Sequence, residues 1–129
     1  MVIHDMSRKT VEKYIRDQYG VEPDFPWEND FVSAVFRHKD NRKWFALIMN
    51  VGKDKLGLEG DGTVDCMNLK IDDPILHDML IHDKGIIPSY HMNKRHWITV
   101  LLDGTFSDNK VFELINVSYQ ATMSRKKRK

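Results

Sequence analysis

Hydrophobic positions recur along the chain with two different spacings, and these predict helical and extended segments in turn. Between Ser7 and Tyr19 the apolar residues come at intervals of three and four, as on one face of a helix. Ser7 is a typical N-cap and Gly20 a typical residue just past a helix, so a helix is predicted over Ser7–Tyr19. Pro23 and Pro26 exclude a helix in the next segment, because proline lacks the backbone donor that a helix interior needs.

The middle of the chain predicts three strands. Two runs of β-branched and aromatic residues, Phe31–Arg37 and Lys43–Val51, flank a short polar stretch and predict a β-hairpin. The glycine-rich stretch Lys53–Gly62 is expected to be a loop. Thr63–Ile71 then alternates apolar with polar residues, which predicts a third strand with one buried face.

The following segment predicts a helix and a second hairpin. Asp72 or Asp73 would be the N-cap and Pro74 the first residue of a helix that is expected to end near Gly85. The runs Ile87–Met92 and His96–Leu102 then flank a short polar turn, and these two runs predict a second β-hairpin.

A last helix is predicted to begin at Ser107 or Asp108 and to turn its apolar residues inward as far as Tyr119. Elements in the order α-β-β-β-α-β-β-α, without an internal repeat, are typical of a two-layer α+β domain. We therefore predict one domain over residues 1–124, with helices against a mainly antiparallel five-stranded sheet. A basic tail, Arg125–Lys129, follows it.

Composition places the chain among globular proteins. Its 129 residues, 41% hydrophobic and 30% charged, are enough to bury a core without disulfides. Cys66 is the single cysteine, so it has no partner for an internal disulfide and nothing indicates an oxidising compartment. No apolar run approaches the ~18–20 residues of a membrane helix, and Met1–Arg8 lacks the apolar stretch of a signal peptide. We expect a cytoplasmic protein that does not interact with membranes.

Net charge conceals an uneven distribution. The chain has 20 basic and 19 acidic residues, and five of the basic residues form the tail Arg125–Lys129, so the remainder has 15 basic residues and a net charge of −4. A nucleic-acid-binding protein with such a body needs its positive charge gathered on one surface, because the body as a whole repels phosphate. The tail has two interpretations: it adds phosphate contacts that ignore sequence, or it is a solvated end.

Motifs that would indicate a reaction or a cofactor are missing from the sequence. His77 and His82 lie five positions apart, ~140° around a helix, whereas chelation from one helix face favours spacings of three or four. Cys66 falls on the inward side of a predicted strand, where it would pack as a small hydrophobic residue. A phosphate-binding loop leads into the N-terminus of a helix. The glycines of Gly57–Gly62 lead into a predicted strand, so this loop does not fit that role. We expect no metal, no cofactor and no catalytic residue.

The two predicted hairpins combine cations, amides and aromatic rings. Around the first turn lie Arg37, His38, Lys39, Arg42 and Lys43, next to Trp44; around the second lie His91, Asn93, Lys94, Arg95 and His96, next to Trp97. Such residues suit phosphate contacts, hydrogen bonds to base edges and stacking on bases. The competing interpretation is that both tryptophans anchor their hairpins in the core and the charged residues only keep two turns soluble.

Long blocks of the sequence resemble the MmcQ/YjbR family. The matching blocks are Tyr19–Trp27, Ala34–His38, Lys43–Met49, Asn68–Lys70, Tyr90–Trp97, Leu101–Gly104 and Ser118–Tyr119, and they extend over nearly the whole chain. Phe25 stands where tyrosine is common in the family, and Ser89 where alanine is common. The resemblance implies a fold like that of the type III secretion chaperones and a predicted DNA-binding role through a "double-wing" motif. It implies no reaction, cofactor or catalytic residue.

The sequence therefore leads to one main hypothesis and two rivals. The main hypothesis is a non-enzymatic DNA-binding domain whose two hairpins contact the sugar-phosphate backbone, with Asn93 and Arg95 as base-reading residues. The first rival is a protein-interaction module that adds a peptide to a free edge of its sheet. The second is a small-ligand site that joins Tyr90, His91, Asn93 and His96 in one pocket.

Overall fold

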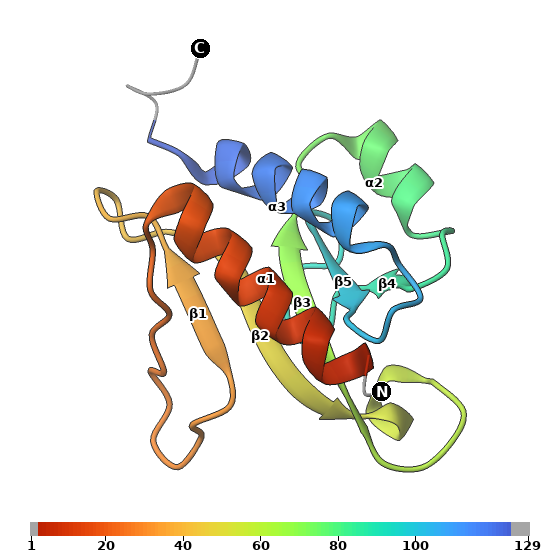
Figure 1. Ribbon diagram of the computed structural model, residues 1–129. Helices are drawn as coiled ribbons and strands as arrows, with labels where there is room; N and C mark the ends of the chain where they lie inside the picture. Colours follow the sequence, from red (N-terminus) through yellow and green to blue (C-terminus); the bar gives the residue numbers. More distant parts are fainter. Residues whose placement is uncertain (1–2, 125–129) are drawn as a thin grey trace.

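The computed structural model describes residues 3–124, with side chains from Arg8 onward, and the predicted basic tail lies outside the described residues. The predicted order of elements and the α+β fold class are confirmed (Figure 1). In chain order the elements are α1 (Ile3–Tyr19), β1 (Ala34–Arg37), β2 (Trp44–Gly52), the short 3-10 helix η1 (Lys53–Leu56), β3 (Thr63–Lys70), α2 (Pro74–Leu80), β4 (Ile86–Pro88), β5 (Trp97–Leu101) and α3 (Asp108–Thr122). No helix among residues 3–124 has the length and apolar composition needed to cross a membrane.

The five strands form one antiparallel sheet in the order β1-β2-β3-β5-β4. Arg37 pairs with Trp44 at the start of β2, and Lys70 at the end of β3 pairs with Trp97 at the start of β5. Because β2 and β3 are antiparallel, these positions all lie at one end of the sheet. The connection from β1 to β2 and the connection from β4 to β5 therefore leave the sheet at the same end.

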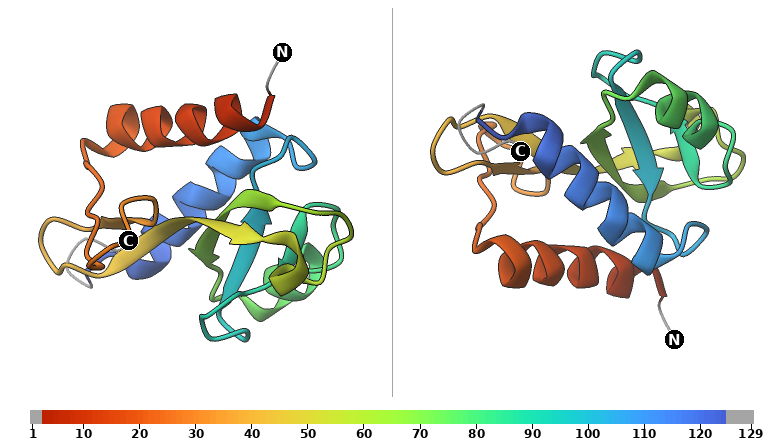
Figure 2. Two further views of the ribbon diagram at one scale, coloured as in Figure 1. Left: turned by 90° about the horizontal axis from the view of Figure 1, so that it is seen from below. Right: turned by 90° about the horizontal axis from the view of Figure 1, so that it is seen from above.

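Helices α1 and α3 cover one face of the sheet (Figures 1 and 2). Val11 and Ile15 of α1 meet Ile115 of α3 above Phe45 and Ile48 of β2, and all five side chains are fully buried. Burying a side chain of this size contributes roughly 1.5–3 kcal/mol. This cluster is the main core, and it holds both ends of the chain's regular structure onto the sheet.

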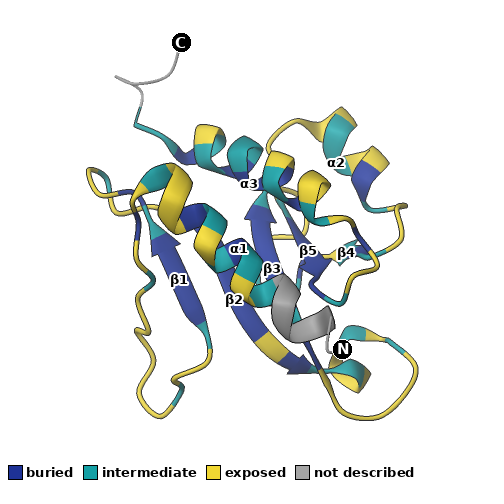
Figure 3. Ribbon diagram, in the orientation of Figure 1, coloured by how far each residue is buried: buried dark blue, intermediate teal, exposed yellow. Residues whose placement is uncertain are grey.

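The opposite face of the sheet is covered by connections instead of α1 and α3. Its buried side chains include Leu47 and Met49 of β2 and Cys66 of β3, against which Leu58 and Tyr90 pack from two different connections. β3 was predicted to bury one face only, and this is wrong, because its apolar residues point alternately into the two clusters. Figure 3 shows the contrast between the buried strands and the exposed connections.

Helix ends confirm the capping chemistry at two of three predicted positions. Asp73 accepts hydrogen bonds from Ile75 N and Leu76 N at the start of α2, and Ser107 accepts one from Lys110 N at the start of α3. The predicted start of the first helix at Ser7 is wrong, since α1 begins at Ile3. Ser7 is instead the fifth residue of the helix.

Three other boundaries differ from the prediction. α2 ends at Leu80, well before Gly85, because the chain turns through Ile81. β1 begins at Ala34 and not at Phe31, because the side chain of Asp30 binds the backbone N–H groups just before the strand. β4 ends at Pro88, and beyond it Tyr90 N donates to the side-chain hydroxyl of Thr99 on β5 instead of to a backbone carbonyl.

Candidate nucleic-acid interface

The first connection, residues 38–43, is a tight turn held by its own backbone. His38 N donates to Lys43 O at 2.9 Å and Arg42 N donates to His38 O at 3.1 Å. The Asn41 side chain accepts from Lys43 N at 2.9 Å. Arg42 has a φ of +63°, in the left-handed region that non-glycine residues adopt mainly in turns. The turn therefore presents its cationic side chains from a defined backbone.

His38 is a correction to the predicted contact residues. Its side chain is only 3% exposed, so it does not reach a ligand on the surface. Its Nε2 lies 2.7 Å from the Thr122 hydroxyl of α3, and its ring packs against Tyr119 and Phe45. Asn41 Nδ2 also donates to Thr122 O, at 3.0 Å. His38 thus anchors the first connection to the last turn of α3.

Arg37 at the end of β1 and Arg42 in the first connection hold an acidic residue that the sequence did not point to. Asp24 Oδ2 lies 2.8 Å from Arg37 Nε and 3.4 Å from Arg42 Nη2. The Arg37 guanidinium also lies over the Trp44 ring, 5.5 Å from its centroid. These three charged residues line a shallow depression of about 310 Å³ together with Lys39. Part of the predicted positive charge is therefore already neutralised within the chain.

The second connection, residues 89–96, is fixed to the sheet by buried polar groups. Asn68 of β3 donates from Nδ2 to Tyr90 O at 2.8 Å, and Thr99 of β5 accepts from Tyr90 N at 2.9 Å. The Thr99 hydroxyl in turn donates to Asn68 Oδ1 at 2.5 Å. Farther along, Asn93 Oδ1 accepts from Arg95 N at 2.8 Å. Asn93 therefore shapes the turn as well as being a predicted base reader.

The remaining predicted residues of the second connection point to different partners. His96 Nδ1 lies 3.5 Å from Asp72 Oδ1, beyond the end of β3. His91, with a φ of +66°, packs its ring against Tyr90 and lines an apolar groove. The predicted small-ligand site is therefore not assembled, because only His91 of its four residues lines that groove. Lys94 and Arg95 are exposed.

The two connections leave the same end of the sheet but project in different directions. Both views of Figure 2 show the first connection at one side of the molecule and the second connection apart from it. The exposed cations of the two connections consequently form two groups and not one continuous stripe. One group is Lys39, Arg42 and Lys43, and the other is Lys94 and Arg95. α3 ends beside the first group, so the basic tail is attached to the chain next to it.

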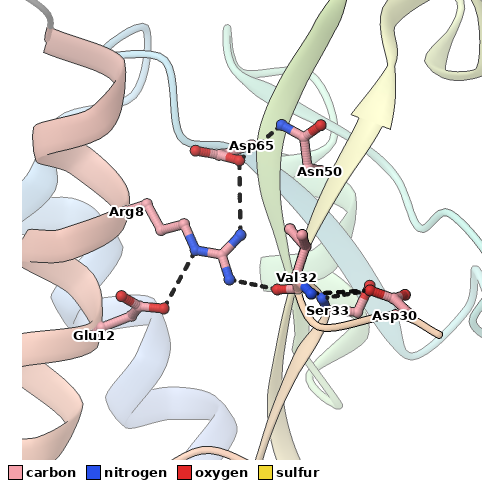
Figure 4. A network of polar contacts seen from close by, with 7 residues as sticks. All are labelled: Arg8, Glu12, Asp30, Val32, Ser33, Asn50 and Asp65. Carbon is pink, nitrogen blue, oxygen red and sulfur yellow. Dashed lines mark hydrogen bonds and ion pairs between the residues drawn. The ribbon is translucent and has the colours of Figure 1, made fainter. Parts of the chain in front are cut away.

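A polar network at the other end of the sheet was also missed from the sequence. Figure 4 shows Arg8 of α1 between three segments: it lies 3.2 Å from Glu12 and 3.7 Å from Asp65 of β3, and it donates to Val32 O. Asn50 of β2 donates to Asp65 at 2.9 Å. The Arg8 side chain is 16% exposed, so these contacts tie α1 to the sheet away from most of the solvent.

The described residues offer little for metal or nucleophilic chemistry. Among residues 3–124, no three histidine, cysteine, aspartate or glutamate side chains lie where they could share a metal ion. Burial raises the pKa of the Cys66 thiol to about 12, so the thiolate that a nucleophile requires is not formed at neutral pH. Burial also raises the pKa of Tyr19, with smaller contributions from Tyr14 and Tyr119. These rings belong to the packing between α1 and α3.

The chain has relatives among known proteins. The sequence model of the YjbR family matches residues 16–121. The uncharacterized protein YyaQ of Bacillus subtilis is 41% identical over 117 residues, which cover 91% of this chain and 98% of YyaQ. The uncharacterized protein YjbR of Escherichia coli is 46% identical over a shorter stretch of 37 residues, 29% of this chain and 31% of YjbR.

Solved structures share the fold. A crystal structure of a Pseudomonas syringae protein, 45% identical, has a TM-score of 0.87 and is matched over 90% of this chain and 98% of its own. A Deinococcus radiodurans protein with a DUF419 domain, 25% identical, has a TM-score of 0.68 over 95% of this chain and 82% of its own. With a family match over most of the chain and a relative aligned over nearly its full length, the chain belongs to the MmcQ/YjbR family.

Proposed function

We propose that this chain is a non-enzymatic DNA-binding domain that contacts the sugar-phosphate backbone through its two connections. The observation that supports this is the gathering of exposed cations at one end of the sheet, on a body that is otherwise acidic. Lys39 and Lys43 contact phosphates at the first connection, and Lys94 and Arg95 contact them at the second. Because the groups project differently, they contact separate stretches of one duplex. A domain of this size buries roughly 600–1,000 Å² of protein surface on DNA.

Duplex binding at several salt concentrations tests the proposal. We expect log K to fall with log salt by ~0.9 for each phosphate that the domain neutralises. A Lys94→Glu/Arg95→Glu variant is expected to bind roughly tenfold more weakly, because two phosphate contacts become repulsive. Its control is Lys55→Glu/Lys84→Glu, which changes the net charge equally at exposed positions near the opposite end of the sheet.

Two outcomes would contradict the proposal. One is no binding at low salt by the chain with its tail present. The other is equal weakening by the two charge-reversal variants, which would mean that only net charge matters. If removal of Arg125–Lys129 abolishes binding while Lys94→Glu/Arg95→Glu does not change it, the tail and not the connections holds the DNA.

Replacing Asp24 tests the first connection in the opposite direction, because this change is expected to raise DNA affinity. Since its carboxylate occupies Arg37 and Arg42, a DNA phosphate must displace or share it. We expect Asp24→Asn to raise DNA affinity severalfold, by an amount that fades as salt screens the charges. Asp83→Asn removes an exposed negative charge away from the connections and is the control. If Asp24→Asn remains folded and binds DNA more weakly than the unchanged chain, Arg37 and Arg42 do not contact the DNA.

A protein partner is the second candidate, and exposed apolar residues ahead of β1 favour it. Phe31 is 80% exposed and Val32 48% exposed, although large hydrophobic side chains are usually covered. Peptide addition to a sheet edge, the form predicted from the sequence, is less well supported. Asp24 already exchanges two backbone hydrogen bonds with Val35 of the edge strand β1, at 2.8 and 2.9 Å, and the other edge strand is short and ends at Pro88. A partner that remains bound after nuclease treatment would favour this candidate over DNA.

A further inference from the structure

An apolar groove lies on the face of the sheet that α1 and α3 leave open. Leu47 and Met49 of β2 form its floor, and Trp27, Trp44 and Met92 line it from the side. Its volume is about 410 Å³, within the range of roughly 300–1,000 Å³ that is usual for small-molecule sites. The groove is separate from the cations of the two proposed DNA contacts, although His91 of the second connection lines it.

Two tryptophans form a corner of this groove. The centroids of Trp27 and Trp44 lie 5.7 Å apart and their planes meet at 88°, an edge-to-face contact in which the edge of one ring lies against the face of the other. The face of an aromatic ring is negative and attracts cations, and tryptophan attracts them best. The guanidinium of Arg37 already lies over Trp44, 5.5 Å from its centroid, so a cation in the groove depends mainly on the ring of Trp27.

The polar residues of the groove favour positive charge over negative charge. The carboxylate of Asp30 lines the groove and accepts hydrogen bonds from Ser33 N and Val32 N, both at 3.0 Å. The backbone N–H of Ser33, its side chain and the N–H of Val32 lower the pKa of Asp30, and the charge of Arg8 lowers it further, so the group is an anion at neutral pH. An anionic ligand would be repelled by Asp30. No lysine or arginine is among the described residues that line the groove, so none would offset this repulsion there.

We propose that the groove binds a small organic cation, an ammonium group that carries alkyl substituents. Alkyl groups fit the floor of Leu47 and Met49, which would not replace the water shell of a metal ion or of a bare ammonium. The positive charge lies against the ring of Trp27 and near Asp30. A neutral molecule of the same shape gains the apolar contact but lacks the attraction to the rings and to the carboxylate.

Titration with choline, and with 3,3-dimethylbutan-1-ol as its uncharged analogue of equal shape, tests the proposal. Binding is followed by the NMR shifts of the tryptophan indole N–H groups. We expect choline to bind roughly tenfold more tightly than the alcohol, the ratio that a desolvated cation–π contact supports. A peptide with a trimethylated lysine, titrated in parallel, shows whether the cation belongs to a free molecule or to a protein side chain, since the source with the higher affinity is the better occupant.

Three variants locate the site. Trp27→Leu removes one wall and is expected to weaken choline binding roughly tenfold; at 39% exposure the side chain is not part of the core, so the fold should persist. Asp30→Asn keeps an acceptor for the two backbone amides while removing the charge, and a severalfold loss is expected. Phe31→Ala, next to the groove but not lining it, is the control and should bind as the unchanged chain does.

The proposal fails if choline and the alcohol bind equally, if neither shifts the indole signals, or if Phe31→Ala has the same effect as Trp27→Leu. These results would not bear on DNA binding, because Lys94 and Arg95 do not line the groove.

Discussion

Replacing Asn68 with alanine is expected to lower the free energy of unfolding by about 3 kcal/mol. Asn68 is fully buried on β3, and its amide both donates to Tyr90 O and accepts from the Thr99 hydroxyl. Without it, Tyr90 O lacks its side-chain donor and the Thr99 hydroxyl lacks its acceptor, and each unsatisfied buried polar group costs roughly 1–3 kcal/mol. Denaturant unfolding of the variant and the unchanged chain measures the difference.

The control for this variant is Asn109→Ala, at an exposed position in the first turn of α3. A change within about 0.5 kcal/mol is expected there, as for most surface substitutions. A second readout addresses the second connection directly. Because Asn68 holds Tyr90, trypsin should cut after Lys94 or Arg95 faster in Asn68→Ala than in the unchanged chain. If Asn68→Ala and Asn109→Ala unfold alike, the polar contacts do not hold the connection.

Replacing Ser118 with alanine is expected to cost a similar amount, about 3 kcal/mol. Ser118 lies on α3 and is fully buried, and its hydroxyl donates to Phe45 O at 2.6 Å and accepts from Lys70 N at 2.8 Å. The β2–β3 ladder pairs Ala46 with Leu69, so Phe45 and Lys70 would form the next pair. The hydroxyl therefore bridges two strands where their direct pairing stops, and alanine leaves two backbone groups unsatisfied.

Ser124→Ala is the matched control for Ser118→Ala, because Ser124 is the last described residue and lies beyond the end of α3. We expect a change within about 0.5 kcal/mol for this control in the same denaturant experiment. Ser118→Ala should leave the DNA-contact cations in place, so its DNA affinity under native conditions should match that of the unchanged chain. Equal stability of Ser118→Ala and the unchanged chain would contradict the bridging role.

Local chemistry was predictable from the sequence, and long-range pairing was not. The caps at Asp73 and Ser107 depend on residues two or three positions away, so a short window of sequence contains them. His38 follows a strand beside several charged residues and therefore looks like a surface residue. It is buried because Thr122, 84 positions later, returns to it on α3. Only the topology of the sheet and helix brings those two residues together.

The same limit explains what was missed at the candidate site. Asp24 was not singled out, although it holds two arginines that lie 13 and 18 positions later in the sequence. The backbone of Asp24 pairs with Val35 of the edge strand β1, and this pairing brings the carboxylate of Asp24 to the arginines. Pro23 and Pro26 excluded a helix in that segment, but they did not indicate the strand with which the segment pairs.

Ser89 shows how a departure from the family becomes interpretable once burial is known. Its hydroxyl is buried and has no hydrogen-bond partner among residues 3–124. Alanine, the residue common at this position in the family, would fill nearly the same volume without an unsatisfied polar atom. The sequence showed the departure but not whether the position faced solvent, because Ser89 was predicted inside a strand that in fact ends at Pro88.

The place where α3 ends has a practical consequence for fusion proteins. Met123 and Ser124 line a second depression, of about 370 Å³, together with Lys39, so whatever follows Ser124 in the chain starts beside the first group of cations. α1 begins toward the opposite end of the sheet, near the contact of Arg8 with Asp65 (Figure 1). An affinity tag or fluorescent label for the binding experiments therefore belongs at the N-terminus.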